Sequence, residues 1–64
     1  MNVEVVAERV RAEFEEMPGM TLTMPQASRL FGIEHEVCRT IVERLVTTSY
    51  LRWTQTGAVT RAAR

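Results

Sequence analysis

Two short amphipathic segments meet at Gly32, and this junction constrains the fold of the chain most strongly. Ahead of the junction, Thr23 and Gln26 have the spacing of a capping box, in which each side chain bonds the backbone amide of the other residue. This spacing predicts a helix over residues 24–31. Glycine adopts the left-handed backbone that ends a helix at little cost, so we expect the helix to end at Gly32 and the chain to change direction there.

Past the junction, apolar residues recur at the spacing of one face of a helix. They are Cys38, Ile41, Val42 and Leu45, at positions i, i+3, i+4 and i+7. The pattern predicts a helix over residues 34–48 with one buried stripe. Two helices joined by a tight turn form a helix-turn-helix, but small helical bundles give the same pattern. The residues after the second helix must therefore distinguish between these two folds.

The C-terminal part of the chain has the pattern of a β-hairpin over residues 51–61, with Gly57 suited to its turn. Side chains alternate between the two faces of a strand, so Leu51 and Trp53 should share a face. We expect these two residues, together with Val59 on the opposite strand, to close the hydrophobic core.

Two helices and a hairpin in this order resemble a winged helix-turn-helix domain, the fold of many small bacterial transcription regulators. The resemblance covers residues 20–61, about two-thirds of the chain. It is carried by Leu22-Thr23, Gln26 to Ile33, Val42 to Leu45, and Tyr50 to Arg52. The resemblance implies an α+β fold of three helices with a C-terminal two-stranded wing, double-stranded DNA as partner, and a role in transcription regulation.

Two positions depart from the pattern of this family. Glu34 stands where Ser, Thr or Asp usually caps the recognition helix, and Ser49 stands where Gly usually follows that helix. The whole chain also resembles short bacterial proteins that carry the segment Met-Pro-Gly-Met-Thr-Leu-Thr, found here at residues 17–23. That second resemblance identifies no activity.

An apolar stripe near the N-terminus predicts a first helix over residues 2–17. Its members are Val3, Val6, Ala7, Val10, Phe14 and Met17. Asn2 is a suitable N-cap, and the Pro-Gly pair at residues 18–19 disfavours any continuation of the helix. Residues 21–22 could add a short strand beside the wing. We expect residues 1–64 to form a single domain.

Hydrophobic residues make up 45% of the chain and charged residues 25%, which is typical of a globular domain. No apolar run approaches the roughly 20 residues that cross a bilayer, and the first residues include Glu4 and Glu8 instead of a basic leader. We therefore expect a soluble, cytoplasmic protein. A chain of this size buries little surface, so a homodimer or another protein partner could add to its core.

The formal net charge is zero, but the charges are unevenly distributed. Residues 1–20 hold five glutamates and two arginines, a net charge of −3, whereas residues 49–64 hold three arginines and no acidic residue. All eight basic residues are arginine, whose planar guanidinium suits contacts with phosphate and guanine. An arginine-only composition can equally reflect a GC-rich genome.

Few residues suggest catalysis or metal binding. His35 and Cys38 are three residues apart, which in principle suggests a nucleophile and its base, but only Cys38 lies on the apolar stripe. We expect Cys38 to be a small core residue, and a single cysteine forms no intramolecular disulfide. The glutamate pairs Glu15-Glu16 and Glu34-Glu36 are typical of solvent-exposed helix surface and do not indicate acid-base catalysis. We therefore expect no enzyme and no metal or cofactor site.

The candidate DNA-binding residues lie off the core stripe of the third helix, on the wing, and on the helix before the turn. They are His35, Glu36, Arg39, Thr40 and Arg44, then Arg52, Arg61 and Arg64, and finally Ser28 and Arg29. Arg39 suits a bidentate contact to guanine, Thr40 a thymine methyl group or a phosphate, and Glu36 the amino group of cytosine.

The glutamates on the third helix also support a different class of function. Glu34, Glu36 and Glu43 make this helix electrostatically poor for DNA, because neutralising phosphates supplies most of the affinity. The alternative is a winged-helix protein-protein interaction module without DNA binding. An exposed apolar patch on the first helix, or on the Trp53 side of the wing, would favour this alternative.

Overall fold

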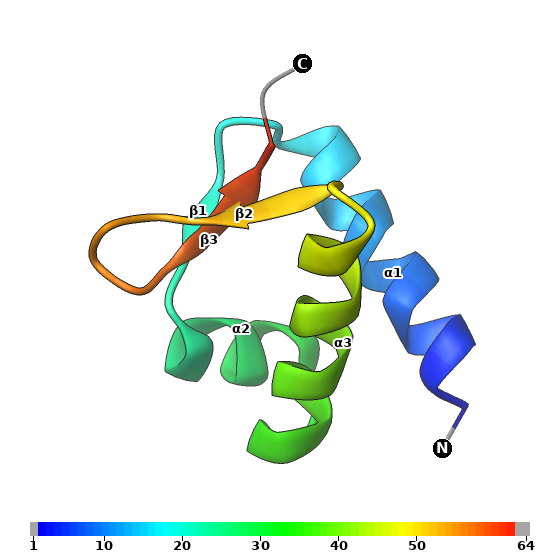
Figure 1. The fold of residues 1–64 in the computed structure, drawn as a ribbon. Coiled ribbons are helices and arrows are strands. Elements are labelled where there is room, and N and C mark those ends of the chain that lie inside the picture. The colour runs from blue at the N-terminus through cyan, green and yellow to red at the C-terminus, as the bar shows by residue number, and fades with distance from the viewer. Residues whose placement is uncertain (1, 63–64) are drawn as a thin grey trace.

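The computed structural model describes residues 2–62, in which three helices pack against a small antiparallel sheet (Figure 1). In chain order the elements are α1 (Val3–Glu16), β1 (Thr21–Leu22), α2 (Met24–Phe31), α3 (His35–Thr47), β2 (Leu51–Trp53) and β3 (Val59–Arg61). The α+β class, with three helices and a C-terminal hairpin, is confirmed. α2 has the predicted bounds, and α1 and α3 are each one residue shorter at both ends than predicted.

Side-chain caps mark the beginnings of α1 and α2. The Oδ1 atom of Asn2 accepts a hydrogen bond from the amide of Glu4 at 2.9 Å. The capping box predicted at α2 is present, because the amide of Gln26 donates to Thr23 Oγ1 at 3.3 Å and the amide of Thr23 donates to Gln26 Oε1 at 3.0 Å. Each such cap stabilises a helix by about 1 kcal/mol. Glu34, at the beginning of α3, makes no side-chain cap hydrogen bond.

Residues in the left-handed conformation end both α2 and α3. Gly32 has φ 65°, as predicted for the turn between them. Ser49 follows α3 with φ 68°, where the related family usually has glycine. The amides of Ser49 and Tyr50 donate to the carbonyls of Val46 and Leu45, both at 2.9 Å, in the pattern of a Schellman motif. These two hydrogen bonds hold a serine in a conformation that non-glycine residues seldom adopt.

β3 is the central strand of the sheet and pairs antiparallel with β1 on one side and β2 on the other. Trp53 lies opposite Val59 in the β2–β3 pair. The hydroxyl of Thr60 also donates to the carbonyl of Met20 at 2.8 Å, which joins the segment before β1 to the sheet. The short strand expected at residues 21–22 is thus confirmed as the third strand of this sheet.

The hydrophobic core lies where α1, α2 and the sheet meet α3. Its largest fully buried side chains are Phe14, Ile41, Leu51, Val10, Val42, Val59 and Cys38. The stripe predicted on α3 is confirmed, because all four of its residues are buried. Among residues 2–62, no helix is both long and apolar enough to cross a membrane.

Trp53 is the exception to the predicted core, and that prediction was wrong. Its side chain is 39% exposed, whereas Leu51 and Val59 are buried as expected. Trp53 is the last residue of β2 and lies next to the loop of the hairpin, which extends beyond the helices (Figure 1). Strand alternation predicts which side chains share a face of the sheet, but it does not show which of them other elements cover.

Candidate nucleic-acid interface

The side of α3 opposite its core stripe is open to solvent. Its exposed side chains are His35, Glu36, Arg39, Thr40, Glu43 and Thr47. The helix therefore presents a continuous polar surface about four turns long. The Thr40 hydroxyl donates to the carbonyl of Glu36 at 3.0 Å, so its hydrogen is used within the helix and its methyl group remains available.

Arg39 and Glu43 form an ion pair on this open surface. The Nε atom of Arg39 donates to Glu43 Oε2 at 3.2 Å, and the two side chains are 63% and 54% exposed. They are one helical turn apart, so they are neighbours on the same face. The pair offsets one of the negative charges that the sequence places on α3.

Arg44 does not share this surface. Its guanidinium forms a hydrogen-bonded ion pair with Glu4, which lies on α1. A groove of about 220 Å³ on this side of the molecule is lined by residues of α1 and α3, with Arg11 and Glu8 also on its wall. Arg44 was a candidate DNA contact, but the structure turns it toward α1.

Arg61 is also held from the α1 side. Its guanidinium lies 3.4 Å from a carboxylate oxygen of Glu15, and its side chain is 26% exposed. Its Cζ atom is 4.7 Å from the centre of the Tyr50 ring, within cation–π distance. The Nε atom of Arg61 is buried and has no hydrogen-bond partner within residues 2–62. Arg61 of the hairpin thus makes contacts within the fold, to Glu15 and Tyr50.

Tyr50 joins these contacts into one cluster. Its hydroxyl lies 2.6 Å from the Glu15 carboxylate, to which it donates, and the guanidinium of Arg11 lies 4.7 Å from its ring. Burial and, second, the hydrogen bond to Glu15 raise the pKa of Tyr50, while the positive charges of Arg61 and Arg11 act in the opposite direction. We name Arg11, Glu15, Tyr50 and Arg61 the tyrosine cluster; it connects α1 to the sheet.

On α2, the two candidate contacts differ in their availability. The hydroxyl of Ser28 donates to the carbonyl of Ile33 at 2.5 Å, so it braces the turn between α2 and α3. Arg29 is exposed and has no ion-pair partner among residues 2–62. Of the two, only Arg29 has its polar group free for an external partner.

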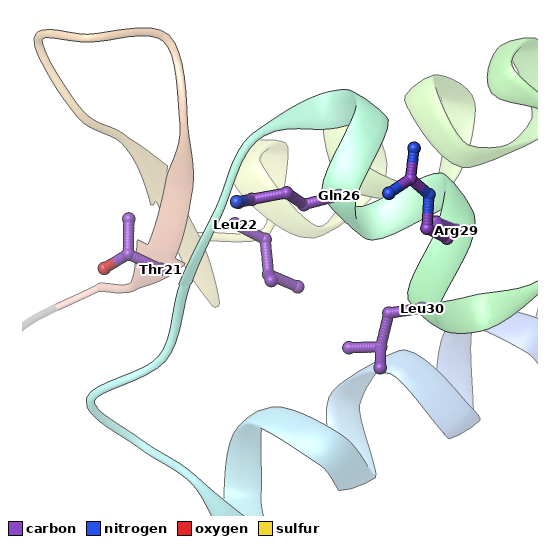
Figure 2. A pocket seen from close by; sticks show the side chains of 5 residues that line it. All are labelled: Thr21, Leu22, Gln26, Arg29 and Leu30. Carbon is purple, nitrogen blue, oxygen red and sulfur yellow. The ribbon is translucent and has the colours of Figure 1, made fainter.

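An open groove of about 570 Å³ lies beside Arg29 (Figure 2). It is lined by Thr21, Leu22, Gln26, Arg29 and Leu30. Figure 2 shows Leu30 extending from α2 on the side of the groove where α1 passes, while the side chain of Arg29 extends in a different direction from that of Leu30. Leu30 is 49% exposed, so the groove has an apolar part that the protein itself does not cover.

The hairpin provides the other exposed cation. Arg52 is exposed on β2 and has no ion-pair partner among residues 2–62, and Trp53 beside it is partly exposed. The turn is fixed by Gly57, which has φ 84°, and by the amide of Ala58 donating to Thr54 Oγ1 at 3.1 Å. Arg64, the last candidate contact, lies outside the described residues.

Groups that could support covalent or metal chemistry are separated from one another. His35 is exposed on α3, whereas Cys38 is 1% exposed in the core, where burial raises the pKa of its thiol. Within residues 2–62, no three His, Cys, Asp or Glu side chains gather where they could hold a metal ion.

The structure thus divides the candidates into two groups. Arg29 and Arg52 are exposed without an ion-pair partner among residues 2–62, and Arg39 is exposed and paired with Glu43 on the same helix. Arg44 and Arg61 are paired with glutamates of α1. Sequence reasoning missed Glu43 as a partner of Arg39, although their i,i+4 spacing could have indicated it, and missed the exposure of Trp53. Comparison with known protein families, curated proteins and solved structures finds no match for this chain.

Proposed function

We propose that this chain binds double-stranded DNA as a winged helix-turn-helix protein and serves as part of a transcription regulator. One observation carries the proposal: the outer face of α3 is polar and uncovered along its whole length, because α1, α2 and the sheet all pack on its other side. An α-helix with such a face fits the width of the major groove of B-form DNA.

The exposed arginines support this docking mode. Arg39 projects from α3, where a guanidinium can form two hydrogen bonds to the O6 and N7 atoms of guanine. Arg29 on α2 and Arg52 on the hairpin lie outside α3 and have no ion-pair partners among the described residues. They would neutralise phosphates on either side of the groove, which positions the protein without reading sequence.

The acidic residues limit the affinity that this surface can reach. Glu36 and Glu43 share the open face of α3, and of these two only Glu43 forms an ion pair with an arginine within residues 2–62. Arg44 and Arg61 contact glutamates of α1, which leaves Arg29, Arg39 and Arg52 among the candidate arginines within residues 2–62. Each neutralised phosphate contributes a salt slope of about −0.9, so with Arg29 and Arg52 as the phosphate contacts a monomer should show a log-log slope of about −2 and a dimer about twice that.

A titration of labelled duplex DNA across a series of salt concentrations tests the proposal. Fluorescence anisotropy measured with the full chain should show binding that weakens linearly, on a log-log scale, with rising salt. Absence of salt-dependent association at low ionic strength would contradict DNA binding. Gel filtration of the same samples separates the monomer slope from the dimer slope.

A protein-docking function is the second candidate, and the exposed apolar side chains favour it. Val5, Met17 and Leu30 are 63%, 56% and 49% exposed, and Trp53 is 39% exposed. Exposed apolar side chains mark an interaction site where they form one contiguous patch. Analytical ultracentrifugation tests the simplest form, a homodimer: a dimer that Trp53→Ala dissociates would support docking through the hairpin, and a monomeric mass at high concentration would exclude it.

A further inference from the structure

We propose that Glu43 is a positioning residue for Arg39, which makes the Arg39–Glu43 pair a single unit for recognising guanine. The inference rests on the proposed DNA-binding function and deepens it. By sequence alone, Glu43 is an acidic residue that should repel DNA. The structure instead places its carboxylate on the guanidinium of the best candidate for reading a base.

The geometry of the pair determines which edge of the guanidinium is free. Glu43 accepts from Nε of Arg39 at 3.2 Å, and neither terminal nitrogen of Arg39 has a hydrogen-bond partner within residues 2–62. A guanidinium has five N–H groups in a rigid plane. With Nε occupied, the two terminal nitrogens remain as a parallel pair of donors, and this pair matches the O6 and N7 acceptors of guanine.

The positioning effect should appear mainly in the complex. An exposed ion pair of this kind is weak in water, where solvent screens it and the arginine samples other rotamers. DNA would exclude water from the surface of α3 and lower the local dielectric constant, which strengthens the attraction between the two charges. Glu43 would then hold Arg39 in its base-reading rotamer and so reduce the conformational entropy lost on binding.

Glu36 provides a matched comparison on the same helix. It lies on the same open face and carries the same charge, but its carboxylate has no ion-pair partner among the described residues. Glu36→Gln removes a negative charge, and with it any contact of that carboxylate to cytosine, whereas Glu43→Gln removes a negative charge and weakens the support of Arg39. If Glu43 positions Arg39, the two substitutions will have different effects on sequence preference.

The experiment begins with selection of preferred duplexes from a randomised library by the wild-type chain. Dissociation constants are then measured for the selected duplex and for copies in which each guanine is replaced by adenine or by 7-deazaguanine. Wild type should lose about tenfold in affinity at the guanine that Arg39 contacts. Glu43→Gln should reduce that loss to about twofold. The double variant Arg39→Ala/Glu43→Gln should have the same guanine preference as Arg39→Ala alone, because the two residues act as one unit.

Two controls make the result specific to positioning. Glu16→Gln, an exposed glutamate on α1, makes the same charge change and should leave the guanine preference unchanged. NMR of the free protein should show faster solvent exchange of the Arg39 Nε–H in Glu43→Gln than in wild type. An unchanged exchange rate would overturn the pairing independently of DNA.

The outcomes separate this inference from the proposed function. If Glu43→Gln binds every duplex more tightly and retains the guanine preference, Glu43 is only repulsive, and the inference is overturned while DNA binding stands. If the wild-type chain shows no salt-dependent binding and selects no sequence, the proposed function fails and the inference fails with it.

Discussion

The arginines that contact the glutamates of α1 and those that do not have different environments. On the side facing α1, Arg44 and Arg61 contact Glu4 and Glu15, and Arg61 also lies against the Tyr50 ring. On the other surfaces, Arg29 and Arg52 are exposed and contact no acidic residue within residues 2–62. The acidic N-terminal helix thus neutralises one set of cations and leaves the other set for an external partner.

This difference shows that the position of a cation in the sequence does not decide its role. Arg52 and Arg61 both belong to the hairpin, yet one is exposed and the other is held by the tyrosine cluster. The carboxylates of α1 decide which arginines remain available.

The tyrosine cluster should contribute most to stability. Tyr50→Ala removes the ring between α1 and the sheet, both cation–π contacts and the hydrogen bond to Glu15, and should lower the free energy of unfolding by about 2–3 kcal/mol. Urea denaturation measures the loss. Tyr50→Phe keeps the ring and should lose only about 1 kcal/mol or less, the contribution of one hydrogen bond. Equal losses in the two variants would contradict a contribution of the ring contacts to stability.

Gly32→Val should have the next largest effect, because it strains the turn that orients α3 relative to α2. The site has open space for a side chain, so the cost arises from the left-handed backbone alone and should be about 1–2 kcal/mol. Gly19→Val is the matched control, since that glycine also has open space but no positive φ. Melting midpoints that fall equally in both variants would contradict a special role for Gly32.

The tyrosine cluster should also make stability depend on alkaline pH. The folded protein raises the pKa of Tyr50 above its ordinary value of 10.0, so folding favours the protonated hydroxyl. This contribution is fully present below pH 10.0 and is lost as the pH rises above that value through the folded pKa. Denaturation midpoints of wild type should therefore fall more steeply above this pH than those of Tyr50→Phe, in which Cys38 still titrates.

The smallest effect is expected for the exposed ion pair on the α1 side. Arg44→Ala should cost about 0.5 kcal/mol or less, because the Arg44 and Glu4 side chains are 48% and 75% exposed and solvent screens their charges. A double-mutant cycle with Glu4→Gln, read by urea denaturation, gives the coupling directly. A coupling energy as large as that of a buried ion pair would contradict the solvent screening expected for this contact.

Local signals in the sequence were sufficient to predict the three helices and to place their ends within one residue. The capping box at Thr23 and Gln26 and the left-handed Gly32 depend only on residues close in the chain, so their spacing carries the information. Ser49 shows the limit of this reasoning, because backbone hydrogen bonds hold it in a conformation that its residue type does not indicate.

The candidate interface could be predicted only in part, because it depends on contacts between distant residues. The Glu4–Arg44 and Glu15–Arg61 contacts join residues about 40 and 46 positions apart, and no periodicity reveals them. The exposure of Trp53 likewise depends on tertiary packing, because strand alternation does not show which positions of a face are covered. The open face of α3 was predictable, since it is the complement of the apolar stripe.

The salt dependence of DNA binding by four arginine variants tests the central claim most directly. Arg29→Ala and Arg52→Ala should each weaken binding to all duplexes and lower the magnitude of the log-log salt slope by about one, because each removes one phosphate contact. Arg44→Ala and Arg61→Ala should leave the slope unchanged, because α1 already holds these side chains. Equal reductions in all four variants, or no effect in any of them, would contradict the division of the arginines between fold and DNA.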